Sequence, residues 1–155
     1  MRKGLGFLVV VVFLCVFRLS AQEKKVENGL TLGLRYNTGF VFEKHEGLIY
    51  ENKLSPSLNF KNNQYTYRLM YEILNKSIQS EVDYELKNGF GLFLSGEKSI
   101  EFDEKYLGIG FDKTFTVLKA SQISLYIELG TNFDEKILPS FGLILHPQWK
   151  ILSIK

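Results

Sequence analysis

Residues 123–130 read Ile123-Ser124-Leu125-Tyr126-Ile127-Glu128-Leu129-Gly130, with an aliphatic side chain at every second position. Because successive side chains of a strand point to opposite faces, a period of two is typical of a β-strand with two chemically different faces. The same alternation recurs about eight times along the chain. The other runs are residues 30–36, 48–60, 65–73, 78–86, 90–97, 107–111 and 137–146.

Short polar segments separate these runs, at residues 61–63, 75–77, 87–89, 119–121 and 134–136. The Asn and Gly residues among them supply the left-handed backbone that tight hairpins need. Neighbouring strands are therefore expected to pair as consecutive antiparallel hairpins. The alternative is a helix over residues 64–86, but the β-branched and aromatic content of that stretch, together with Asn75, favours a hairpin.

Alternation alone does not say which face is buried, so the composition of the polar rows has to decide. In residues 123–130 the polar row contains Ser124, Glu128 and Gly130, which are small residues with a scattered charge. A solvated sheet face would carry more lysine, whereas small residues suit a crowded barrel interior. The opposite row is aliphatic, as a lipid-facing band would be. Lys113 interrupts such a row, so we expect it near a membrane interface, where its stem can reach the headgroups.

A sheet edge inside hydrocarbon would leave backbone groups unpaired, so a membrane sheet of this kind must close on itself. Runs of about 9–11 tilted residues span a bilayer, and eight such runs fit the chain. The predicted fold is all-β: an antiparallel up-and-down β-barrel of about eight strands. Side chains just fill the interior of an eight-stranded barrel, so a solute-conducting pore is not expected.

The first 21 residues have the layout of a cleavable secretory signal. Arg2 and Lys3 precede an apolar run that ends at Arg18, and Ala21 supplies a small residue behind it. The run is shorter than the ~18 residues of a membrane-spanning helix. We expect a signal peptide at 1–21 and one barrel domain at 22–155. Cys15 lacks the small preceding residue of a lipoprotein signal and is interpreted as part of the apolar run.

The charge and the cysteine content argue against a nucleic-acid-binding protein, a disulfide-stabilised domain and a thiolate metal site. Removing Arg2, Lys3 and Arg18 from the 19 basic residues leaves 16 against 17 acidic residues, so the apparent net charge of +2 belongs to the leader. A basic stripe would be the footprint of a nucleic-acid partner, and none remains. The only cysteine also lies in the leader, so no disulfide framework or thiolate metal site is expected in the mature chain.

The leader ending Ser20-Ala21-Gln22 and the strand Gly29-Leu30-Thr31-Leu32-Gly33-Leu34-Arg35-Tyr36 are similar to the small outer-membrane β-barrel proteins common in Bacteroidetes-type bacteria. The resemblance implies a bacterial outer-membrane location, strands that cross the lipid, and contact with the barrel-assembly machinery. Such barrels commonly end on an aromatic residue, whereas this chain ends Ser153-Ile154-Lys155. Either Trp149 replaces that aromatic residue, or the membrane-barrel interpretation is wrong.

Candidate chemistry lies on the inward-facing rows. Because every second residue of a strand points to the same face, two arginines and several carboxylates are predicted to point into the lumen. The candidate ion network contains Arg35, Arg68, Glu72, Asp112 and Glu128. Glu81, Asp83 and Glu85 would point the same way. One interpretation is a binding or proton-relay network. The other is an ion-paired plug, which we favour because unpaired charge in a narrow interior is costly.

Neither histidine has the sequence context of a known site. His45 and His146 lack metal-ligand spacing, so no metal or other cofactor is expected. Outer-membrane lipid A deacylases are small eight-stranded barrels with a His-x-Ser pair. Here His45 is followed by Glu46-Gly47 and His146 by Pro147-Gln148, so the serine is absent. No catalytic residue is carried over.

The sequence thus predicts a non-catalytic outer-membrane barrel with a side-chain-filled lumen and a structural or loop-mediated binding role in the cell envelope. Two alternatives remain. One is a lipid A-modifying, deacylase-like enzyme of the outer membrane, and the other is a soluble secreted β-barrel that binds an apolar ligand. The extracellular ligand and the oligomeric state are not predicted.

Overall fold

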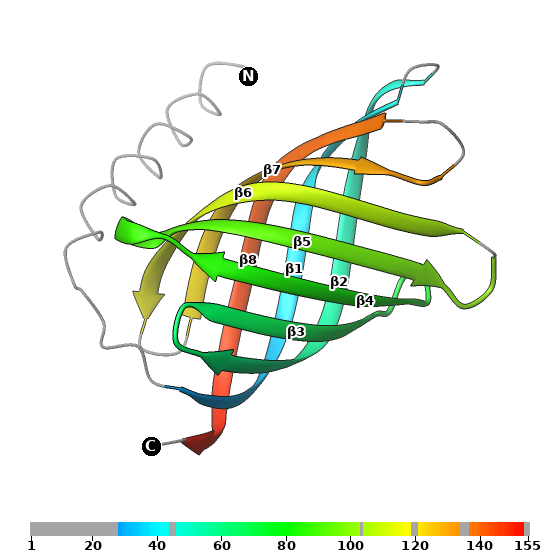
Figure 1. Ribbon diagram of the computed structural model, residues 1–155. Coiled ribbons are helices and arrows are strands. Elements are labelled where there is room, and N and C mark those ends of the chain that lie inside the picture. Colours follow the sequence, from blue (N-terminus) through cyan, green and yellow to red (C-terminus); the bar gives the residue numbers. More distant parts are fainter. Residues whose placement is uncertain (1–27, 44–45, 103, 119–120, 134–136, 154–155) are drawn as a thin grey trace, which may run out of the picture.

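The computed structural model describes residues 28–43, 46–102, 104–118, 121–133 and 137–153. They form eight antiparallel strands in a closed barrel, each strand pairing with the next and β8 pairing with β1 (Figure 1). The predicted up-and-down barrel is confirmed. The strands are β1 (Gly29–Glu43), β2 (Gly47–Asn62), β3 (Tyr65–Glu72), β4 (Ser77–Glu85), β5 (Phe90–Ser99), β6 (Lys105–Leu118), β7 (Ser121–Thr131) and β8 (Ile137–Ser153).

Alternation along each strand divides the side chains as the sequence pattern predicts. In β7, Ser124 and Tyr126 are buried, whereas Ile127 and Leu129 are 61% and 57% exposed. Apart from glycines, most buried residues of the barrel are polar: Arg35, Ser55, Ser57, Asn59, Glu72, Ser77, Glu81, Ser124, Ser140 and His146. Buried apolar residues are few, namely Met70, Phe93, Phe115, Tyr126, Leu138 and Ile144. The barrel is therefore polar inside and apolar outside.

The connections lie at two ends. We call the end where β1 begins and β8 finishes the terminal end, and it also carries the β2–β3, β4–β5 and β6–β7 connections. The other four connections lie at the distal end. The β4–β5 turn contains Asn88 and Gly89 in succession at φ 62° and 72°, the left-handed conformation of a tight hairpin turn. Residues 64–86 form the β3–β4 hairpin, as the sequence favours over a helix.

The strands differ in length from the sequence pattern. β8 continues to Ser153, past the predicted limit of residue 146, because its outward row resumes with Trp149 beside Leu32 of β1. β5 and β6 also extend beyond the predicted runs 90–97 and 107–111, and Lys98 pairs with Lys105. The result is an uneven barrel. β8, β1 and β2 have 17, 15 and 16 residues, whereas β3, β4 and β5 have 8, 9 and 10.

Several predicted features lie outside the described residues: the signal peptide at 1–21 with Cys15, His45, and the turn segments 119–120 and 134–136. Within the described residues, no helix has the length and apolar character needed to cross a membrane.

Candidate functional site: the charged lumen

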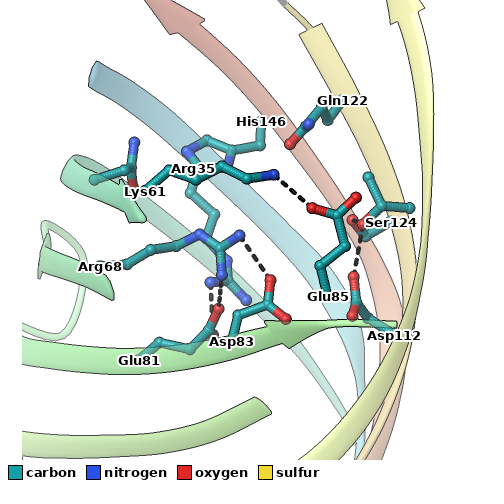
Figure 2. Close-up of polar contacts among 12 residues, drawn as sticks. Arg35, Lys61, Arg68, Glu81, Asp83, Glu85, Asp112, Gln122, Ser124 and His146 are labelled. Atoms are coloured by element: carbon teal, nitrogen blue, oxygen red, sulfur yellow. Dashed lines mark hydrogen bonds and ion pairs between the residues drawn. The ribbon is translucent and has the colours of Figure 1, made fainter. Parts of the chain in front are cut away.

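The centre of the lumen is an ion-paired cluster built from three strands. Glu81 of β4 accepts from Arg35 of β1 at 2.7 Å through Oε2, and from Arg68 of β3 at 2.5 Å through Oε1. Arg68 also donates to Asp83 Oδ2 at 3.0 Å. Figure 2 shows these side chains converging inside the barrel. Because Arg35 and Glu81 are on non-adjacent strands, their pair crosses the lumen and joins two walls.

The charges of this cluster are buried, and removing them from water costs free energy. The side chains of Glu81, Arg35 and Arg68 are only 6%, 10% and 12% exposed. Charges so far from water are tolerated only when paired with good geometry. Both carboxylate oxygens of Glu81 are engaged, each by a different guanidinium. Glu81 is thus the shared anion that neutralises two buried cations.

Asp112 and Glu128 occupy opposite sides of this cluster. Asp112 lines a hollow with Arg68, Asp83 and His146, and its Oδ2 accepts from the Thr114 hydroxyl at 2.6 Å. Glu128 lines a second hollow on the distal side, where Ser95 donates to its Oε1. Arg35 and Glu81 line both hollows and separate them. The structure thus brings Arg35 and Arg68 together through Glu81, with Asp112 and Glu128 on either side.

Glu72 has a different role from the one expected of it. It is fully buried, but its carboxylate accepts from the backbone N–H groups of Leu54 at 3.3 Å and Leu74 at 3.0 Å, and from that of Asn75. These donors belong to β2 and to the β3–β4 turn. Glu72 therefore stabilises a turn at the distal end. The sequence predicts it in the ion network with Arg35 and Arg68, but its carboxylate binds backbone N–H groups instead.

A second ion pair lies in the distal half of the lumen. Lys53 of β2 is 2.8 Å from Glu97 of β5, and Ser77 donates to the other oxygen of Glu97 at 2.6 Å. At the terminal end, Lys61 pairs with Glu85 at 2.5 Å, and these two side chains are 30% and 40% exposed. Ion pairs therefore recur along the lumen from one end to the other, and together with the central cluster they obstruct it.

A serine–histidine contact, absent from the sequence as a motif, forms over Gly33 of β1, between the two strands that flank β1. Ser57 Oγ of β2 lies 3.1 Å from His146 Nε2 of β8, and both residues are buried. Gln148 Nε2 donates to Gln122 Oε1 at 3.0 Å and lies 3.2 Å from His146 Nδ1. When Gln148 donates to Nδ1, a neutral ring carries its proton on Nε2 and donates to Ser57. In that tautomer Nε2, the nitrogen that faces Ser57, has no lone pair with which to deprotonate the serine.

Lys113 lies on the outer surface, near the terminal end of the barrel. Lys113 faces outward on β6, and its Nζ lies 4.1 Å from the centre of the Phe90 ring and donates to the Asn88 carbonyl in the β4–β5 turn. Its stem thus lies along an apolar surface while its charge reaches the terminal end. In the described residues, no group of three or more His, Cys, Asp or Glu side chains is arranged to hold a metal ion.

The fold and lumen define a small closed β-barrel with a polar interior. No family model and no curated protein matches the chain. The solved structures similar to this chain include the following two. Neisserial surface protein A is 11% identical, with 82% of this chain and 100% of that chain covered and a TM-score of 0.49. A de novo designed transmembrane β-barrel is 12% identical, with coverage of 83% and 100% and a TM-score of 0.45.

Proposed function

We propose that this protein is a non-catalytic outer-membrane β-barrel that serves the envelope structurally or through its loops. The observation that carries the proposal is the inverted distribution of polarity. Leu69, Ile109 and Ile127 are 56%, 58% and 61% exposed on the wall, while arginines and glutamates are buried inside. In water such a wall would form an apolar patch well beyond what soluble monomers expose. The apolar outer wall is therefore compatible with a lipid environment.

Aromatic side chains gather at both ends of the wall. Near the terminal end, the rings of Tyr65 and Tyr84 are 5.0 Å apart. Toward the distal end, Phe40 lies 5.4 Å from Tyr50. Membrane barrels carry such aromatic girdles where the apolar band meets the headgroups. The arrangement supports a barrel that crosses a bilayer with its axis along the membrane normal, rather than a soluble assembly.

The alternatives fit the lumen less well. A soluble barrel for an apolar ligand needs an apolar cavity, whereas the described lumen is crossed by ion pairs at Glu81 and Lys53. A lipid A-modifying enzyme needs its nucleophile at the lipid surface, whereas Ser57 and His146 are 3% and 4% exposed and face inward. The obstructed lumen also argues against solute conduction.

Fractionation tests the membrane proposal directly. We expect the exported protein to sediment with membranes, to need detergent for extraction, and to run on gels with a mobility that changes on heating. A high-salt wash, which removes peripheral proteins, is the control and should leave it in the membrane. A folded, monomeric protein in detergent-free buffer would contradict the proposal and favour the soluble ligand-binding barrel.

The topology can be predicted if the chain enters the barrel from the periplasm, which places the terminal end inside and the distal end outside. A cysteine at Glu101, which is 48% exposed in its side chain and paired with Lys76, should then react with an impermeant thiol reagent on whole cells. A cysteine at Asn88, in the β4–β5 turn, should react only after the outer membrane is opened. The reverse pattern would invert the topology.

A further inference from the structure

Two lysines face outward side by side at the distal end of the wall formed by β4, β5 and β6, which are neighbouring strands (Figure 1). Lys98 of β5 and Lys105 of β6 are directly opposite each other in the antiparallel pair, and both are exposed. Directly opposed residues point to the same face of a sheet, with Cβ atoms about 4.5–5.5 Å apart. The two side chains therefore bring two ammonium groups to one place on the outer wall.

The outward pairs below these lysines are apolar until the terminal end is reached. They are Gly96 with Leu107, Leu94 with Ile109, and Leu92 with Phe111. The next outward charge belongs to Lys113, whose partner is Phe90. From that pair to the pair of Lys98 and Lys105 the barrel rises roughly 20 Å, at about 3.4 Å per residue and a tilt of about 40°.

This height places the lysine pair at a membrane interface. The apolar band around an outer-membrane barrel is about 25 Å tall. The level of Lys113 and the level of Lys98 and Lys105 therefore lie near its two edges. Because Lys113 is near the terminal end, Lys98 and Lys105 lie at the level of the headgroups of the distal leaflet.

The surface just below the lysine pair is open and polar. Gly96 faces outward on β5, and its cross-strand partner on β4 is Ser80, which is exposed. A Cβ at Gly96 would have only the Ser80 hydroxyl oxygen, at 3.4 Å, and the Tyr106 carbonyl oxygen, at 3.9 Å, within 4 Å. Hydroxyl and ammonium groups are donors that suit phosphate oxygens. We call this group of outward-facing residues the lysine patch: Ser80, Gly96, Lys98 and Lys105.

The lysine patch carries positive charge toward the lipid. Like charges directly opposite each other destabilise a sheet, and an anion bound between them would relieve the repulsion. None of the ion pairs among the described residues involves Lys98. The nearby carboxylates of Glu101 and Glu104 belong to the β5–β6 connection beyond the end of the wall, and Glu101 pairs with Lys76.

We propose that the lysine patch binds the phosphate group of a lipid in the distal leaflet. In an outer membrane that leaflet contains lipid A, a phosphorylated glycolipid. Its acyl chains would lie along the apolar wall directly below the patch, where Val82, Leu94 and Ile109 are 38%, 50% and 58% exposed. A free phosphate ion would meet the same donors but not this wall. The proposal rests on the membrane location proposed above.

Binding of lipid A to the folded protein in detergent micelles, measured by native mass spectrometry, tests the site. Dephosphorylated lipid A is the comparison, because it keeps the acyl chains and lacks the charge. We expect the parent protein to bind the phosphorylated form on the order of tenfold more tightly, since the lysines attract its phosphate. Excess inorganic phosphate should not displace the lipid. Displacement at equal concentrations would overturn the assignment to a lipid.

Substitution of both lysines identifies the residues responsible. The double variant Lys98→Gln, Lys105→Gln should weaken lipid A binding on the order of tenfold or more, because both ammonium groups are removed. The double variant Lys98→Arg, Lys105→Arg keeps both charges and should retain binding. Lys113→Gln is the matched control, because it makes the same change on the outward row of β6 at the terminal end. It should bind lipid A as the parent protein does.

Three results would overturn the site. The parent protein could bind both forms of lipid A equally, the double glutamine variant could bind as tightly as the parent, or Lys113→Gln could lose as much affinity as the double glutamine variant. Heat-dependent gel mobility tests the folding of each variant independently. If the double glutamine variant does not fold, the preference of the parent protein between the two lipids decides. A parent protein that does not fold in micelles contradicts the membrane proposal instead.

Discussion

Replacing Glu81 with Gln is expected to destabilise the barrel by about 3–5 kcal/mol, the typical effect of removing one partner from a buried ion pair. The substitution keeps the shape of the side chain and removes its charge. Arg35 and Arg68, which Glu81 contacts at 2.7 and 2.5 Å, would then be buried with Asp83 as the remaining direct anionic contact of Arg68. Denaturant unfolding in lipid vesicles can be followed by the fluorescence of Trp149, the only tryptophan.

Glu85→Gln provides the matched control, because it makes the same chemical change in an ion pair near the terminal end. Glu85 contacts Lys61 at 2.5 Å, but the two side chains are 40% and 30% exposed. A pair so accessible to solvent contributes about 0–1 kcal/mol. Equal losses at Glu81 and Glu85 would mean that the central cluster is solvated and does not hold the walls together.

The fold could be predicted because alternation is a local property of the chain. Residues 123–130 show their two faces without reference to any other strand, and their inward and outward rows are those of the structure. Strand ends were less predictable. The alternation predicts a strand that ends at residue 146, yet β8 continues, because pairing with β1 at Trp149 depends on a strand more than a hundred residues away.

The pairings within the lumen could not be predicted. Parity along a strand indicates that Arg35 and Glu81 both face inward, but which inward residues meet depends on the stagger of the strands around the closed barrel. That stagger brings β1 opposite β4, and Ser57 beside His146, which is 89 positions later in the chain. Glu72 illustrates the same limit. Its burial followed from parity, but its backbone partners depend on the conformation of the β3–β4 turn.

Replacing Ile127 with Arg is expected to cost about 2–4 kcal/mol in lipid, the penalty for a charge on the lipid face near the bilayer midplane. Ile127 lies in the middle of β7 and is 61% exposed on the outer wall. Its cross-strand partners are Phe111 of β6 and Phe141 of β8, so an arginine there would find no carboxylate with which to pair. Leu125 is a poorer choice, because its partner Lys113 adds like-charge repulsion.

Ile123→Arg separates the effect of depth from that of charge. Ile123 is on the same outward row, but close to the start of β7 at the terminal end, where a snorkelling side chain reaches the headgroups and the cost falls to about 0–1 kcal/mol. Unfolding free energies in vesicles should therefore rank the parent and Ile123→Arg together, with Ile127→Arg well below. If both variants match the parent, the apolar row does not face lipid, and a barrel surrounded by water or by protein becomes the better explanation of its exposed wall.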